Sequence, residues 1–368
     1  MLKLTSIVTL AFALLLLLHF GSQRAFLPEE TAASSQVIGI ALTATHATAT
    51  RRYSNGSFHD LGRVESQTEY VELIERLTSW GSEHPRYVRP EHRSSNMSLT
   101  HGSPPYFSME DSWNDWPRQI SRSARKAVGL PASFDVAVLA RLIGPVVKVV
   151  EETDSSPISA LISFPALRGL YQEDIVDAAT YVGLDKIANG YEYHPHELVA
   201  TFAGHGLGLN PSGNDTDEFE HRPTLLVEYT EKALLLHHRY MTKAVEIPWP
   251  HMQLQMSFDM GSDQDPDREA IGHFVYTFLY DEYIKRIGGP APDKVTILLS
   301  GSAQSLSDGK VEEGAALAAG VVGSDVEVFA TNPEYMAARG AAELVRYEFS
   351  FCESSVRRRL TMSRRGEL

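Results

Sequence analysis

The sequence predicts an α/β protein in which apolar strands alternate with amphipathic helices. Residues 37–42 form an apolar run that ends in a turn of small and hydroxyl residues, as expected for a buried strand. Similar runs occur at 158–165 and 295–299, and apolar residues with helical spacing lie between them. Because 43% of the 368 residues are hydrophobic, the chain can fill the core of a large domain.

Composition and charge exclude several classes of protein. The formal net charge of −14 argues against non-specific binding to nucleic acid, whose phosphates attract basic surfaces. With 22% charged residues and a large apolar fraction, the chain does not have the composition of a disordered protein. Its single cysteine, Cys352, cannot form an intramolecular disulfide, and the sequence pairs no base with it as a nucleophile.

The N-terminal segment predicts entry into the secretory pathway. Lys3 precedes an almost unbroken apolar run from Leu4 to Phe20, which fits either a removed signal peptide or an uncleaved signal anchor. We therefore expect a secreted or single-pass membrane-anchored protein whose body is lumenal or extracellular. Three glycosylation sequons are compatible with that location, at Asn55, Asn96 and Asn214.

The body is expected to begin with a strand–turn–strand unit at 37–50, followed by a helix at 67–80. Residues 81–112 are rich in His, Pro, Ser, Arg and Asn, which predicts an exposed insertion without regular structure. Pro145 lies inside the next helical pattern and predicts a kink or a break there. The remaining expected elements are a helix at 133–150, a strand at 158–165, a helix at 172–182, a strand hairpin at 224–240, a helix at 268–287, a strand at 295–299 and a last helix that Asn332 caps.

The first strand and turn carry a family resemblance. Residues 39–45 read GIALTAT. This stretch resembles the first phosphate loop of the actin-like ATPase superfamily, in particular the seventy-kilodalton heat-shock chaperones, which have Gly-Ile-Asp-Leu-Gly-Thr-Thr there. Four further stretches resemble the same family in the same order, at residues 160–184, 197–207, 228–235 and 332–342, and Gly301 retains one glycine of the adenosine-side loop.

This resemblance implies an architecture for the whole body. We expect a two-lobed actin-like ATPase (ribonuclease H-like) fold of mixed sheets flanked by helices, spanning about residues 35–350. The implied lobe I comprises about 35–221 and 321–350, and lobe II comprises about 222–320. Residues 1–34 form the leader and its spacer, and residues 351–368 form a basic C-terminal tail.

The resemblance also implies site residues. Glu197 and Glu228 stand at positions of catalytic acids, whereas Ala41 and Leu235 replace two carboxylates that would gather Mg²⁺ and its waters. No metal ligand set is assigned. The implied cofactor-binding residues are Thr43, Thr45, Thr230, Gly301 and Gly340.

These losses predict a degenerate ATPase domain. Since each missing group is worth on the order of 2–4 kcal/mol in the transition state, we expect no significant hydrolysis. ATP or ADP would bind weakly, Mg²⁺ would have little affinity, and the protein would act through an unidentified protein partner. The membrane is a further partner if the leader is not cleaved. The alternative is an active, Mg-ATP-hydrolysing chaperone-like enzyme with substituted site residues.

Overall fold

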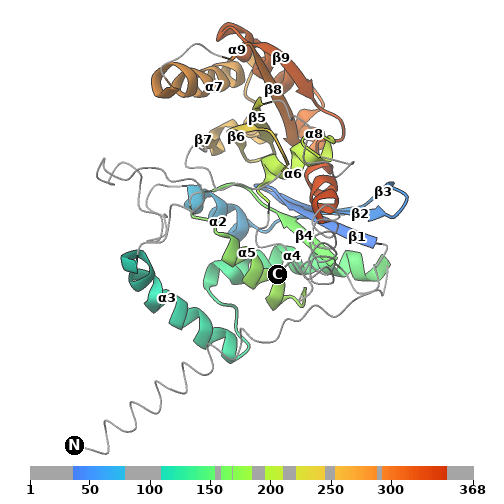
Figure 1. Cartoon of the computed structure of the whole chain (residues 1–368), viewed down its shortest axis with the longest axis vertical. Coiled ribbons are helices and arrows are strands. Elements are labelled where there is room, and N and C mark those ends of the chain that lie inside the picture. Colours follow the sequence, from blue (N-terminus) through green and yellow to red (C-terminus); the bar gives the residue numbers. More distant parts are fainter. Residues whose placement is uncertain are drawn as a thin grey trace, which may run out of the picture. The chain divides into compact units, whose positions relative to one another are not determined.

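The body contains a four-stranded mixed sheet followed by a five-stranded mixed sheet (Figure 1). The computed structural model describes residues 36–78, 109–153, 159–167, 169–184, 195–209, 221–244, 253–287 and 292–345. The first sheet has the order β3-β2-β1-β4, and β1 runs antiparallel to β2 but parallel to β4. Its strands are β1 Gln36–Leu42, β2 His46–Tyr53, β3 Phe58–Glu65 and β4 Ser159–Ser163.

The second sheet repeats this arrangement and adds one strand. Its order is β7-β6-β5-β8-β9, with β5 antiparallel to β6 and parallel to β8. The first four strands of this order therefore pair as β3, β2, β1 and β4 do in the first sheet. The strands are β5 Arg222–Tyr229, β6 Leu234–Met241, β7 Gln253–Ser257, β8 Lys294–Gly301 and β9 Asp325–Phe329.

Helices flank both sheets and fill the space between them. In the first half these are α2 Thr68–Thr78, α3 Met109–Ala127, α4 Phe134–Thr153 and α5 Gln172–Tyr181. The others are α6 Glu197–Gly204, α7 Arg268–Tyr280 with a π-helical continuation η5 Asp281–Ile287, α8 Ala303–Leu306, α9 Lys310–Val321, the short turns η3 Phe258–Met260 and η4 Ser262–Gln264, and a last helix at 336–345. Apolar residues of α6, of the last helix and of the second sheet join the core of the first sheet, so the two lobes share buried apolar surface.

Three local expectations are corrected. Pro145 lies inside the single helix α4, so of the two expected alternatives, a kink or a break, the break is excluded. α3 begins at Met109, so residues 109–112 do not belong to an irregular insertion, and residues 81–108 lie outside the described part of the chain. Asn332 has φ of 47°, whereas an N-cap residue is extended, and its side-chain amide donates to Asp60 at 3.1 Å instead of capping a helix.

The other expected elements are present, and the second sheet extends further along the chain than expected. The second sheet continues through β9 to Phe329, beyond residue 320 where lobe II was expected to end. The expected helix at 268–287 is α7 with its π-helical continuation. No helix within the described ranges is long and apolar enough to cross a membrane; the leader lies outside those ranges.

Candidate functional site

The turn between β1 and β2 directs its backbone donors to protein groups. The Ala44 N–H donates to Glu228 Oε1 of β5 at 2.7 Å, so a carboxylate of the second sheet lies where a phosphate oxygen was expected. The Thr45 N–H and the His46 N–H both donate to Thr43 Oγ1, at 3.3 and 3.1 Å. These three donors are therefore engaged within the protein, and all three lie in the first phosphate-loop position of the sequence prediction.

The two predicted catalytic acids form a buried pair between the sheets. Glu197, the first residue of α6, and Glu228 are each 1% exposed, and each carboxyl group influences the protonation of the other. Burial raises the pKa of Glu197 well above its usual value, and the charge of the neighbouring Glu228 raises it further. Burial also raises the pKa of Glu228, although interactions with Glu197 and the Ala44 N–H partly lower it. Both carboxyl groups are therefore protonated more readily than exposed acids, and Ser300 Oγ donates to Glu197 Oε1.

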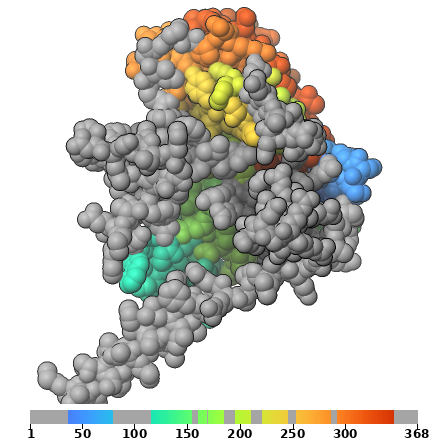
Figure 2. Space-filling view, viewed as in Figure 1, coloured from blue at the N-terminus to red at the C-terminus, as the bar shows by residue number. Residues whose placement is uncertain are grey.

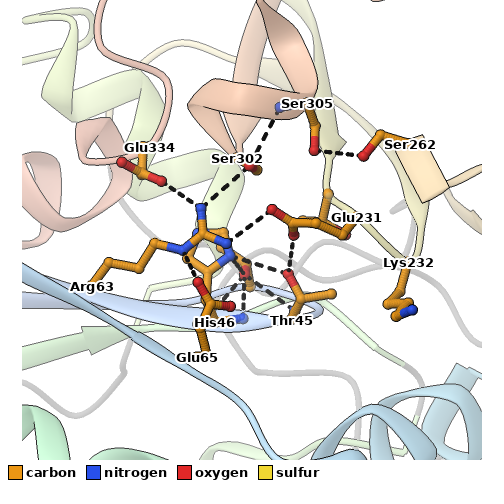
Figure 3. Close-up of polar contacts among 12 residues, drawn as sticks. Thr45, His46, Arg63, Glu65, Glu231, Lys232, Ser262, Ser302, Ser305 and Glu334 are labelled. Carbon is orange, nitrogen blue, oxygen red and sulfur yellow. Dashed lines mark hydrogen bonds and ion pairs between the residues drawn. The ribbon is translucent and has the colours of Figure 1, made fainter.

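Arg63 of β3 joins the two lobes through a cluster of acids (Figure 3). Its Nη2 donates to Glu231 Oε1 at 2.9 Å, in the turn between β5 and β6, and its Nη1 donates to Glu334 Oε1 at 2.6 Å. Nη1 also donates to Ser302 Oγ at 3.3 Å, and Nε forms an ion pair with Glu65 at 2.7 Å. One guanidinium thus holds three carboxylates, two of which, Glu231 and Glu334, come from distant parts of the chain.

The electrostatics of this cluster leave it acidic. Burial raises the pKa of Glu231, but hydrogen bonds from Ser302 and Arg63 outweigh it and lower the pKa to about 2. Burial, and then the charge of Arg63, lower the pKa of His46 to about 3, so this imidazole is neutral at pH 7 and offsets no acid. Lys232 points away from the cluster and pairs with Asp263 at 2.5 Å (Figure 3).

The other predicted cofactor-binding residues are placed as follows. Thr45 Oγ1 donates to Glu231 Oε2 at 3.0 Å, and the Thr230 N–H donates to the Ala233 carbonyl at 3.0 Å, within its own turn. The Gly301 N–H donates to the Pro333 carbonyl at 3.3 Å. Gly340 packs against α6, where an added Cβ would lie 1.7 Å from the Ala200 carbonyl oxygen. Nucleotide contacts of these residues stay a prediction.

Two substituted positions and the sequons complete the sequence-predicted set. Ala41 and Leu235 are each 1% exposed and belong to the hydrophobic core that the two lobes share. Asn55 lies in the exposed turn after β2, where its side chain accepts from the Ser57 N–H at 2.9 Å. Asn96 and Asn214 lie outside the described residues. Within the described residues, no group of three or more His, Cys, Asp or Glu side chains is arranged to hold a metal ion.

Sequence reasoning did not find three of the residues that shape this site. Arg63 lies on β3, a half-exposed strand without an apolar run, so no local signal marked it. Tyr70 falls on the apolar face of the predicted helix, where its hydroxyl donates to the Thr43 carbonyl at 2.8 Å. Glu334 lies inside the stretch that resembles the family, but Arg63, which it contacts, is 271 positions away in the sequence. For these three residues, the one informative sequence feature was a hydroxyl-bearing side chain, Tyr70, on an apolar helix face, because a buried hydroxyl needs a hydrogen-bond partner.

A small cavity lies beside the cluster but differs from a nucleotide site in size and position. It has a volume of about 60 Å³ and is lined by residues of β3, α2 and α4 and the intervening turn, among them Val64, Glu65, Tyr70, Leu142 and Pro145. Ligand pockets typically measure about 300–1,000 Å³, so this cavity cannot hold a nucleotide.

Comparisons with known proteins give likenesses in structure but none in sequence. No protein-family model and no curated protein sequence matches the chain. Among solved structures, the chain is similar to the ethanolamine utilization protein EutJ from Carboxydothermus hydrogenoformans, with a TM-score of 0.44 and 10% sequence identity, over 86% of this chain and 91% of that chain. A likeness of this size does not extend to site chemistry, which rests on the contacts within this chain.

Replacing Arg63 with methionine should lower the free energy of unfolding by about 2 kcal/mol at pH 7, between the values for buried and exposed ion pairs. The side chains of Arg63 and Glu231 are 19% and 29% exposed, so solvent screens part of the interaction. Because the pKa of Glu231 is lowered, its contribution exists above its unfolded value near 4.5 and is lost as the pH falls toward about 2.

Urea unfolding at several pH values measures this effect. Arg268→Met is the matched control, because Arg268 pairs with Glu313 at 3.0 Å while both side chains are more than half exposed. We expect the control to change stability by about 0.5 kcal/mol or less. Equal losses in the two variants would show that Arg63 does not hold the lobes together.

Proposed function

We propose that this chain is a degenerate actin-like domain protein, related to the heat-shock chaperone ATPases, that works without hydrolysing ATP. It enters the secretory pathway through its leader and acts by binding a protein partner. Any binding of ATP or ADP is weak and independent of Mg²⁺.

The sheet topology supports the fold part of this proposal. Both sheets place an antiparallel hairpin beside a parallel strand, and the order is the same in the two lobes. This agrees with the two lobes of mixed sheet that the sequence resemblance implies. Because one fold serves many functions, the loss of activity must be argued from the site itself.

The hydrogen bond from the Ala44 N–H to Glu228 is the observation that carries the functional proposal. A phosphate held by this turn would have to displace a buried carboxylate and lie among Glu231, Glu334 and the Glu197–Glu228 pair. Like charges at such distances repel strongly in a partly desolvated site, so a triphosphate is disfavoured. The positions of the two missing metal-side carboxylates, Ala41 and Leu235, are part of the apolar core and offer Mg²⁺ no oxygen.

Titration of the full chain with ATP and ADP, with and without Mg²⁺, tests the proposal. We expect dissociation constants in the millimolar range or weaker, no dependence on Mg²⁺, and no phosphate release above that of a sample without protein. Micromolar, Mg²⁺-dependent binding with steady phosphate release would establish the alternative of an active ATPase. In that case Glu197→Ala and Glu228→Ala should abolish the release.

A further inference from the structure

α3 packs on the protein through its polar face. Arg122 is buried and donates to Asp174 at 2.5 Å and to Asp177 at 2.6 Å, both on α5. Lys126 donates to Asp177 at 2.8 Å, and Asp115, one turn before Arg118, is also buried. With 3.6 residues per turn, residues 115, 122 and 126 fall on one side of the helix, so this side faces α5.

The opposite side of α3 and the turn that follows it expose apolar side chains. Ile120, Val128, Leu130 and Phe134 are 61%, 71%, 48% and 70% exposed, and we call these four residues the apolar corner. The space-filling view shows α3, in teal, at the surface of the described part of the chain (Figure 2). Single exposed apolar residues are common, but four within fifteen positions, with Ile120 on α3 and the other three in the turn after it or at the start of α4, indicate a contact surface.

The apolar corner is held in place by its own hydrogen bonds. The Leu130 N–H donates to the Arg125 carbonyl at 3.0 Å, and Gly129 has φ of 75°, which together form a helix-ending Schellman turn. Arg125 Nε donates to the Pro131 carbonyl at 2.7 Å, and Ser133 Oγ accepts from the Val136 N–H at 3.1 Å at the start of α4. The side chains are thus presented on an ordered support, which lowers the entropy lost on binding.

We propose that the apolar corner inserts shallowly into the surface of a lipid bilayer. The proposal rests on the membrane-anchored form of the proposed function, in which the run from Leu4 to Phe20 holds the chain at a bilayer. Because the anchor and the body belong to one chain, a second contact of the body with the same bilayer can be weak and still contribute to binding. Apolar side chains that insert shallowly among lipid headgroups bind in proportion to the apolar area that they bury.

The charges around the apolar corner predict which lipids matter. Arg118, Arg122 and Lys126 are each paired with acids of α5, namely Glu173, Asp174 and Asp177. These pairs neutralise three of the four basic residues of α3, and the fourth, Arg125, donates to the Pro131 carbonyl, so the surface selects anionic lipids only weakly. Insertion should occur on neutral phosphatidylcholine and should change little between low and high salt, because apolar burial drives it.

A fluorescent probe at the apolar corner tests the proposal on the full chain reconstituted in phosphatidylcholine vesicles. In a Cys352→Ser background, Phe134→Cys receives a polarity-sensitive label, and Leu317→Cys is the matched control. Leu317 is also apolar and is 60% exposed, but it lies on α9 of the second lobe. We expect nitroxides in the lipid headgroup region to quench the probe at 134 at least threefold more than the probe at 317, and Leu130→Asp to abolish the difference.

Three results would overturn the proposal. Equal quenching at the two positions would show that the corner stays in water. If quenching at 134 disappears when the ratio of protein to lipid is lowered, the apolar corner contacts a second copy of the chain and does not insert on its own. Quenching that disappears at high salt would show that electrostatic attraction, and not apolar burial, holds the corner at the bilayer. The readout needs no nucleotide, so its failure leaves the non-hydrolysing proposal standing, and detection of ATP turnover would not affect it.

Discussion

Replacing Gly340 with alanine should lower the free energy of unfolding by about 3 kcal/mol or more, the upper end of the range for overpacked cores. An added Cβ would lie 1.7 Å from the Ala200 carbonyl oxygen and 2.6 Å from the Gly204 nitrogen, and both are backbone atoms of α6. A side chain could rotate away, but a helix must move as a whole. Gly39→Ala should act similarly, because its Cβ would lie 1.8 Å from the Ala338 carbonyl oxygen.

Gly320→Ala on α9 is the matched control for these two variants. Nothing lies within 4 Å of its added Cβ, and Gly320 is inside a helix, so alanine should raise stability by roughly 0.5–1 kcal/mol. Urea unfolding of the three variants at one pH measures the contrast. If Gly340→Ala lost less than about 1 kcal/mol, the close approach of the last helix to α6 would not be a feature of the folded protein.

The position of Gly340 also shows where the sequence was informative. The stretch at 332–342 was identified by its resemblance to a family. The sequence alone could not show whether Gly340 leaves room for a bound ligand or for the backbone of a neighbouring helix. Strands with continuous apolar runs, such as β1 and β8, were predicted, since burial on both faces leaves that pattern. β3, β7 and β9 were not predicted, because half-exposed residues interrupt their apolar pattern.

Interrupted apolar patterns also limit prediction of the site. Glu197 and Glu228 were named from the sequence, and the structure brings them together, but Arg63 came from a strand that was not recognised. Its partners Glu231 and Glu334 are separated from it by 168 and 271 positions. Such contacts depend on the packing of the lobes and cannot be predicted from the local sequence around Arg63. α3 was also not predicted as a helix, because its polar residues, which face α5, obscured its apolar stripe.

Glu197→Gln should stabilise the protein by about 2 kcal/mol at pH 7, by an amount that grows with pH. The raised pKa of Glu197 means that its contribution to stability is complete below the unfolded value of 4.5 and is lost as the pH rises toward the folded value. Keeping this carboxyl protonated costs about 1.4 kcal/mol per pH unit above 4.5, which sets an upper limit of about 3.4 kcal/mol at pH 7. Glutamine needs no such proton, and its amide can donate a hydrogen bond to Glu228 at any pH in the range.

Urea unfolding of the wild type and the variant at pH 5, 7 and 8.5 measures this dependence, with the exposed Glu313→Gln as control. A constant difference between the two proteins over that range would mean that Glu197 is ionised in the folded state. The result also bears on the proposed function, because a pair with one protonated carboxyl carries one negative charge instead of two. Such a pair attracts Mg²⁺ less strongly than two ionised acids would.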